Sequence, residues 1–372
     1  MTTMSDRTRI IGRQLRTARE ALGLSKEAVA ARIGAAETEI ERWESEVEQP
    51  DVETLWEMAR LYHRSPDYFL KQTAETPRQV NFRLAGRVSL EQLSAETRET
   101  IVRFEELCRW HHELESLIGK QRTVGIPHLP EARDPATTAA RERHRMGLDS
   151  KPIPDLRALL EGQGLRIFEL PVPGGEFAGL SWWNRTYGPC ALINAADPAG
   201  RRNFTTAHEY AHLLVGRATT VCDLTQNTPD EVFAQRYAAA FLMPEGDIRK
   251  VAQDRGIVGT TPGARELEPL ARRYQVSLEA AGRRLEELGL IPKGSTDARL
   301  HEWQSQTLFR RRPRSPTWRR RLGESYVQSS LEAYGHGVIS LGRLSELLGV
   351  DVRKAREVHQ QEGRERRPSD GM

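Results

Sequence analysis

The sequence is poor in the residues that would build a disulfide framework, a membrane span or a secretory leader. Only three cysteines occur in 372 residues, and none has C-x-x-C spacing, which argues against a disulfide scaffold and a thiolate zinc site. No apolar run approaches the roughly 18 residues of a membrane-spanning helix. Residues 1–20 lack the apolar core of a signal peptide. We therefore expect a cytoplasmic protein with no membrane partner.

The chain also lacks a dominant charge and has few aromatic residues. The net charge is only +3, and aromatic residues make up 6% of the composition. A balance of this kind gives no whole-chain attraction to nucleic acid or to an anionic membrane, so local charge must carry any such interaction. The length is sufficient for two or three domains, each with its own core.

Apolar periodicity predicts five short helices between residues 7 and 70. Ser25 is expected to cap the second helix and Gly34 to end it, and Asp51 is expected to cap the fourth. Pro66 is expected to start the last short turn of helix. Two short helices joined by a turn of three or four residues form a helix-turn-helix unit.

The remaining chain divides by composition. Three short runs rich in β-forming residues, within 164–172, 177–183 and 190–194, predict a small sheet, and helical patterns follow it. Near the C-terminus, Ser340 and Gly349 are nine residues apart, as are Ser25 and Gly34. Seven arginines fall within 310–321, which indicates either a nucleic-acid contact or, as we prefer, a solvated linker. The predicted domains are 7–72 (helix-turn-helix), 73–150 (helical connector), 151–291 (α+β), 292–321 (basic linker) and 322–372 (small helical segment).

The stretch FTTAHEYAHLLVG, residues 204–216, carries the pattern His-Glu-x-x-His. On a helix, His208 and His212 differ by roughly 40° and project from one face. Their nitrogens can then bind one ion at about 2.0–2.1 Å. Glu209 lies beside such an ion and can take a proton from a water molecule whose pKa the ion lowers. The alternative is a half-buried helix that binds no metal.

Catalytic zinc normally has three protein ligands, so a third ligand is required. Glu231 follows His212 by 19 residues, at the start of the next predicted helix. The sequence Thr228 to Glu231 is also a capping box, in which Glu231 would only bond the backbone of its own helix. Asp230 and Glu245 are substitute ligands, and spacing alone leaves the choice open.

Two segments, CALINAADPAGRRNFTTAHEYAHLLVG and DEVFAQRYAAAFLMP, resemble the ImmA/IrrE family of metallopeptidases. The resemblance covers residues 150–291 approximately, and it departs from the family pattern at Asn203, Gln235 and Tyr237. It implies a zincin-like fold within a multi-domain, mainly α-helical chain. We expect Tyr237, in an aromatic position of the pattern, to pack in the core.

The same resemblance implies the chemistry and the ligands. His208, His212 and Glu231 would hold one Zn²⁺ per chain, with Mn²⁺ as the alternative ion, and Glu209 would act as the general base. Endopeptidase activity is implied on a regulatory protein, such as a repressor or an antitoxin, in a stress or mobile-element response. The rival hypothesis is a DNA-binding regulator or antitoxin with a structural or vestigial metal site.

Residues 10–70 resemble the five-helix XRE-type helix-turn-helix domain. Lys26, Thr38 and Arg42 are the positions expected to contact operator DNA, and a homodimer is an option. However, the predicted recognition helix, 36–48, holds six glutamates against one arginine, which opposes its approach to a groove lined by phosphates. Protein recognition is therefore the preferred use of this helix. The six acids are Glu37, Glu39, Glu41, Glu44, Glu46 and Glu48.

Overall fold

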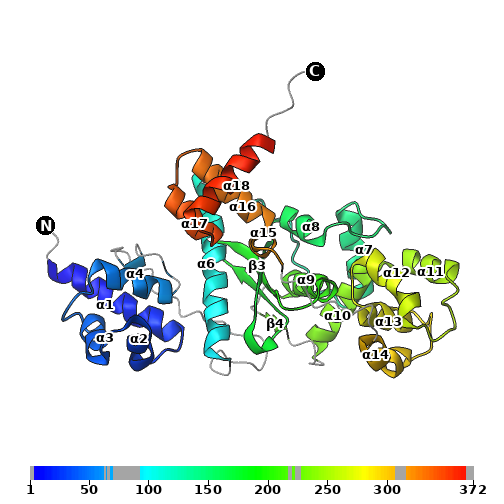
Figure 1. Cartoon of the computed structure of the whole chain (residues 1–372). Helices are drawn as coiled ribbons and strands as arrows, with labels where there is room; N and C mark the ends of the chain where they lie inside the picture. The colour runs from blue at the N-terminus through cyan, green and yellow to red at the C-terminus, as the bar shows by residue number, and fades with distance from the viewer. Residues whose placement is uncertain are drawn as a thin grey trace, which may run out of the picture. The chain divides into compact units, whose positions relative to one another are not determined.

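The computed structural model describes residues 4–62, 64, 68–69, 93–216, 220–222, 228–305 and 316–365. The chain is mainly helical with one small mixed sheet (Figure 1). It forms two compact units, the first of Met1–Arg109 with Val172–Glu176, the second of Trp110–Pro171 with Phe177–Met372. The predicted fold class is confirmed: N-terminal helix-turn-helix helices, an α+β region and C-terminal helices. The predicted domain boundaries stay predictions.

The first unit begins with four helices whose ends follow from local sequence. The Ser25 hydroxyl accepts a hydrogen bond from the Ala28 amide at 3.0 Å, and Gly34 ends that helix with a left-handed φ of 69°. The Asp51 carboxylate accepts from the Thr54 amide at 2.7 Å. The fifth predicted helix lies mostly outside the described residues. The four helices are α1 (Met4–Ala21), α2 (Lys26–Ile33), α3 (Glu37–Glu44) and α4 (Val52–Leu61).

Glu44, one of the six acids of the predicted recognition region, is a structural residue. Its carboxylate accepts two hydrogen bonds from the Arg19 guanidinium, at 2.6 and 2.9 Å, and both side chains are largely buried. A bidentate pair of this kind fixes α3 against α1 and removes one negative charge from the surface. The surrounding core includes Leu15, Leu22, Ile40, Trp43 and Met58.

The sheet of the second unit has the strand order β1-β3-β2-β4. β1 (Arg166–Leu170) is parallel to β3 (Gly188–Asn194), whereas β2 (Gly179–Asn184) is antiparallel to both β3 and β4 (Thr220–Cys222). The three predicted strands are confirmed. β4 was not predicted, because three residues carry no periodic signal. A 3₁₀ turn, η2 (Pro173–Gly175), follows β1 in sequence.

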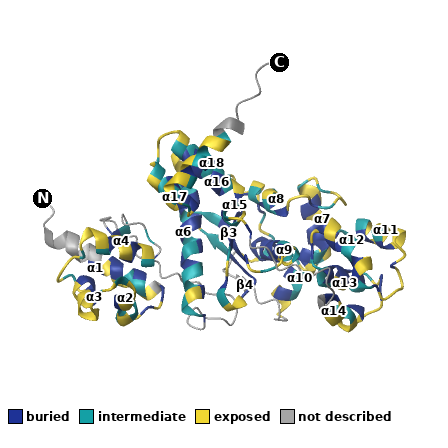
Figure 2. Cartoon of the chain, viewed as in Figure 1, coloured by how far each residue is buried: buried dark blue, intermediate teal, exposed yellow. Residues whose placement is uncertain are grey.

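Helix α9 (Ala199–Val215) packs on β2 and β3, and α10 (Pro229–Leu242) packs on α9. Figure 2 shows that most of α9 is buried, and every residue from 205 to 214 is buried. The other helices are α6 (Ala95–Leu117), α7 (Pro135–Arg145), α8 (Leu156–Gly162), α11 (Glu245–Asp254), α12 (Ala264–Tyr274), α13 (Leu278–Glu287), α14 (Ser295–Ser305), α15 (Trp318–Leu322), α16 (Glu324–Gly335), α17 (Leu341–Leu348) and α18 (Val352–Glu365).

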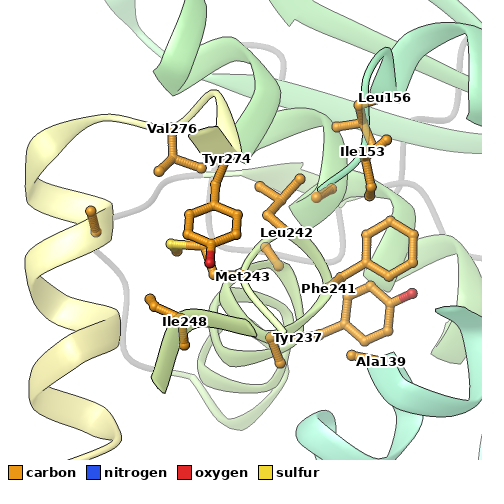
Figure 3. Packing of buried hydrophobic residues seen from close by; sticks show 14 of the residues in the cluster. Ala139, Ile153, Leu156, Tyr237, Phe241, Leu242, Met243, Ile248, Tyr274 and Val276 are labelled. Carbon is orange, nitrogen blue, oxygen red and sulfur yellow. The ribbon is translucent and has the colours of Figure 1, made fainter. Parts of the chain in front are cut away.

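The main core surrounds the C-terminal half of α10 (Figure 3). Tyr237 and Phe241 stack nearly parallel, with ring centroids 5.5 Å apart. Ala139 of α7 packs in the same cluster, so α7 is part of the core that supports α9 and α10. In the part of the chain that the structure describes, no helix combines the length and apolar character that crossing a bilayer requires.

Candidate metal centre

The His-Glu-x-x-His pattern lies in the C-terminal half of α9, as the spacing predicts. Every residue from 205 to 214 is buried, because one side of the helix faces the sheet and another faces α10. His208, Glu209 and His212 therefore lie in a region that largely excludes water. Helix α9 is otherwise largely apolar here, and it places the polar side chains of His208, Glu209 and His212 inside the fold.

His208, His212 and Glu231 converge on one point. The Nε2 atom of His208 is 2.9 Å from Oε2 of Glu231 and 3.0 Å from Nε2 of His212. The Nε2 atom of His212 is 3.4 Å from Oε1 of Glu231. Donors that bind one ion tetrahedrally at about 2.0–2.1 Å must lie roughly 3.3 Å apart. These donor distances fit a shared metal ion, and their two-imidazole, one-carboxylate chemistry suits zinc.

The sequence allows Glu231 to be either a third metal ligand or part of a capping box, and its position in the structure distinguishes the two. Its backbone amide donates to the Thr228 hydroxyl at 3.3 Å, so the cap of α10 forms. Its side chain does not complete the capping box and contacts the two histidines instead. Asp230 and Glu245, the substitute ligands, are exposed. Among the described residues, His208, His212 and Glu231 form the one group of three side chains with metal-binding geometry.

Burial and mutual contact shift the pKa values of all three groups. Burial lowers the pKa of His208 to about 4, although Glu231 opposes the shift. Burial also disfavours charge on His212, but the hydrogen bond to Glu231 and the charge of Glu209 together raise its pKa. For Glu231, the contacts from both histidines outweigh burial and lower its pKa to about 2. At a pH below its raised pKa, His212 is therefore the ligand from which a metal ion must displace a proton.

Zinc retention is expected to depend on pH through His212. Zinc binds the neutral imidazole, so protons compete with the ion as the pH falls through the raised pKa of His212. Below that pKa, each further pH unit should weaken zinc binding by about tenfold, since one proton exchanges for the ion. Titration with a chelating zinc indicator at several pH values measures this, with circular dichroism as the control for folding. A zinc affinity that stays constant down to about pH 5 would contradict the assignment.

Glu209 lies against Gly179, the first residue of β2. A Cβ atom added at Gly179 would lie 2.6 Å from Cγ2 of Thr205 and 2.7 Å from Oε1 of Glu209. No real Cβ contact is that short, so any larger residue would displace the carboxylate. Gly179 was not identified from the sequence. The one signal there is a glycine near the start of a predicted strand, which can mark a site where another group approaches closely.

If Glu209 is the general base of a metallopeptidase, as the sequence resemblance implies, Gly179→Ala should lower turnover by about 10²-fold while metal binding is kept. The reason is that a displacement of about 1 Å at a reacting group can cost that much, whereas the three ligands are not touched. Gly246→Ala is the matched control, because its added Cβ would meet its nearest neighbour at an ordinary 3.8 Å. Equal turnover of both variants, measured on one fluorogenic peptide, would show that Gly179 does not constrain Glu209.

Tyr210 anchors the middle of α9 to α7. Its hydroxyl donates to Oε2 of Glu142 at 2.8 Å and accepts from Arg145 at 3.3 Å. Arg145 also donates to the Glu142 carboxylate at 2.8 Å. This buried link lies between the two histidines in sequence and fixes the rotation of the helix. It was not predicted, because Glu142 is distant in sequence and no local pattern marks it.

The residues predicted to contact DNA belong to the first unit, whereas the metal centre belongs to the second. The Nζ atom of Lys26 lies 3.3 Å from Oε1 of Glu41, and Nη1 of Arg42 lies 3.3 Å from Oε1 of Glu48. Thr38 is exposed on α3. Both predicted cations therefore have acidic neighbours that compete with a phosphate.

Comparison with known proteins agrees with these observations. Residues 160–286 match the model of a peptidase family described as the IrrE N-terminal-like domain. Residues 15–69 match the helix-turn-helix model, which implies DNA binding. No curated protein matches the chain. The predicted resemblance is confirmed, and the chain carries an IrrE N-terminal-like metallopeptidase domain together with an N-terminal helix-turn-helix domain.

Proposed function

We propose that this chain is a zinc-dependent endopeptidase that cleaves a specific regulatory protein, a repressor or an antitoxin, in a stress or mobile-element response. The observation that carries the proposal is the convergence of His208, His212 and Glu231 beside Glu209, within the match to a peptidase family. We place the reaction in the reducing cytoplasm, which suits a sequence with only three widely spaced cysteines.

In the proposed mechanism, His208, His212 and Glu231 hold the zinc ion. The ion, when bound, supplies a Lewis acid and lowers the pKa of water. Glu209 accepts the proton of the attacking water at its carboxylate and returns it to the leaving amine. Gly179 leaves the space that this carboxylate occupies. The Tyr210–Glu142 hydrogen bond fixes the helix that carries His208, Glu209 and His212.

The N-terminal domain would select the partner. The exposed face of α3 carries Glu37, Glu39 and Glu41, with Arg42 beside them. An acidic face opposes close approach to phosphates and favours a basic protein surface. We propose that α3 recognises the substrate or a regulator of the peptidase, and that Lys26, Thr38 and Arg42 supply any contact of this domain with operator DNA.

The test compares new protein N-termini in host cells that carry either the wild type or Glu209→Gln, with and without DNA damage. A cleavage that occurs only with the wild type would identify the substrate and its scissile bond. Identical N-termini in both strains under every inducing condition would favour the rival function of a binding protein. A purified substrate that is cut by the wild type alone completes the assignment.

A further inference from the structure

Helices α17 and α18 repeat the local geometry of α2 and α3. The Ser340 hydroxyl accepts from the Arg343 amide at 3.1 Å, as the Ser25 hydroxyl accepts from Ala28 at 3.0 Å. Gly349 ends α17 at φ 61° and ψ 34°, and Gly34 ends α2 at φ 69° and ψ 22°. Both first helices have eight residues, and a three-residue turn follows each of them.

The C-terminal helices pack on one another, and Tyr326 of α16 also packs against Phe168 of β1 and His111 of α6. Three leucines of α17 are buried together with two residues of α18, and α16 packs against α17. The five buried residues are Leu344, Leu347, Leu348, Ala355 and Val358. The Tyr326 hydroxyl donates to the Leu347 carbonyl at 3.2 Å, and His359 packs edge-on against Tyr334. Figure 1 shows α16, α17 and α18 as one group of helices. Three packed helices, the last two joined by a three-residue turn, are also the elements from which a helix-turn-helix unit is built. The buried side chains of α16 are Tyr326, Val327, Ser330, Leu331 and Ala333.

The opposite face of α18 is exposed and carries two arginines, one glutamine and one glutamate. Arg353, Arg356 and Gln360 are all exposed, and the Arg353 side chain is 90% accessible. Positions three and four residues apart lie on one helix face, so these side chains share the surface turned away from Ala355 and Val358. Glu357 is the acid on this face. Its Oε1 atom lies 3.2 Å from Nε of Arg353, and its Oε2 atom lies 3.4 Å from Nζ of Lys354.

We propose that α17 and α18 form a second helix-turn-helix, which binds duplex DNA through the Arg353–Arg356–Gln360 face of α18. Arginine pairs with guanine or with phosphate, and glutamine pairs with adenine in the major groove. The corresponding face of α3 presents Glu37, Glu39 and Glu41 instead. The charge of the two helices thus favours DNA at α18. This inference does not depend on peptidase activity.

The test measures binding of a fluorescein-labelled mixed-sequence duplex by fluorescence anisotropy, with full-length protein carrying Glu209→Gln so that no proteolysis occurs. Arg353→Glu with Arg356→Glu is expected to raise the Kd by about tenfold or more. The slope of log Kd against log salt, taken between about 50 and 200 mM, should fall by about two, since two phosphate-neutralising cations are lost. Glu357→Gln should tighten binding, because it removes the acid that competes for Arg353.

Arg141→Glu with Arg255→Glu is the matched control, since it makes the same change of net charge at two exposed positions elsewhere. It should leave the Kd within about twofold of the parent, because it touches no phosphate contact. A thermal melt verifies that each variant is folded, and the neutral pair Arg353→Gln with Arg356→Gln should show an intermediate loss. The proposal is overturned if both charge-reversed pairs weaken binding equally, if neither does, or if the parent prefers single-stranded RNA to the duplex.

Discussion

Glu209→Gln is expected to lower the turnover of the peptidase by about 10²–10⁴-fold, the contribution of a positioned general base. Glutamine preserves the size of the side chain in the confined space beside Gly179, but it cannot accept a proton from water. Because Glu209 is not among the three converging ligands, zinc content should stay at the wild-type level. The measurement is the cleavage rate of a quenched fluorescent peptide that spans the substrate's scissile bond, with the metal determined by mass spectrometry.

Two further variants separate base chemistry from metal loss. His212→Ala should lose both zinc and activity, because it removes one of the three converging donors. Asp230→Asn changes an exposed carboxylate next to Glu231 and should keep both the zinc and most of the rate. If Glu209→Gln cleaved the peptide at the wild-type rate with zinc bound, Glu209 would not be the base, and the proposed mechanism would be wrong.

Much of the fold follows from local signals. Ser25 and Asp51 cap helices and Gly34 ends one, and each of them bonds to a residue only three or four positions away. Their roles can therefore be predicted from the sequence. The spacing of His208 and His212 likewise determines that they share a helix face. For these features, the interaction that matters lies within one or two turns of the same helix.

The remaining features depend on contacts between distant segments. The sequence allowed Glu231 either a local role in a capping box or a distant role at the histidines. Only the packing of α10 on α9 brings its side chain to His208. Gly179 and Glu142 meet α9 from a strand and a helix that are far away in sequence. Their importance is set by tertiary packing, for which a single sequence carries no periodic or motif signal.

Phe241→Ala is expected to destabilise the second unit by about 3–5 kcal/mol. The side chain is fully buried within the cluster in Figure 3, where it stacks on Tyr237. Its ring centroid is 6.1 Å from that of Tyr210 on α9, so it also holds α10 against the helix that carries the histidines. Truncation removes the apolar burial and leaves a cavity among rings that cannot fully close it. At about 2–4 °C per kcal/mol, the midpoint of thermal unfolding should fall by roughly 6–20 °C.

The control is Val338→Ala, a change at a side chain that is 46% exposed. It should alter the free energy of unfolding by no more than about 0.5 kcal/mol. Zinc binds only the native state, so at equal concentration it should raise the midpoint of Phe241→Ala and of the wild type by similar amounts. A large loss of that zinc-dependent increase would mean that Phe241 positions the metal ligands directly. If Phe241→Ala unfolded at the same temperature as Val338→Ala, the packing of α10 on α9 would not be the main support of the metal centre.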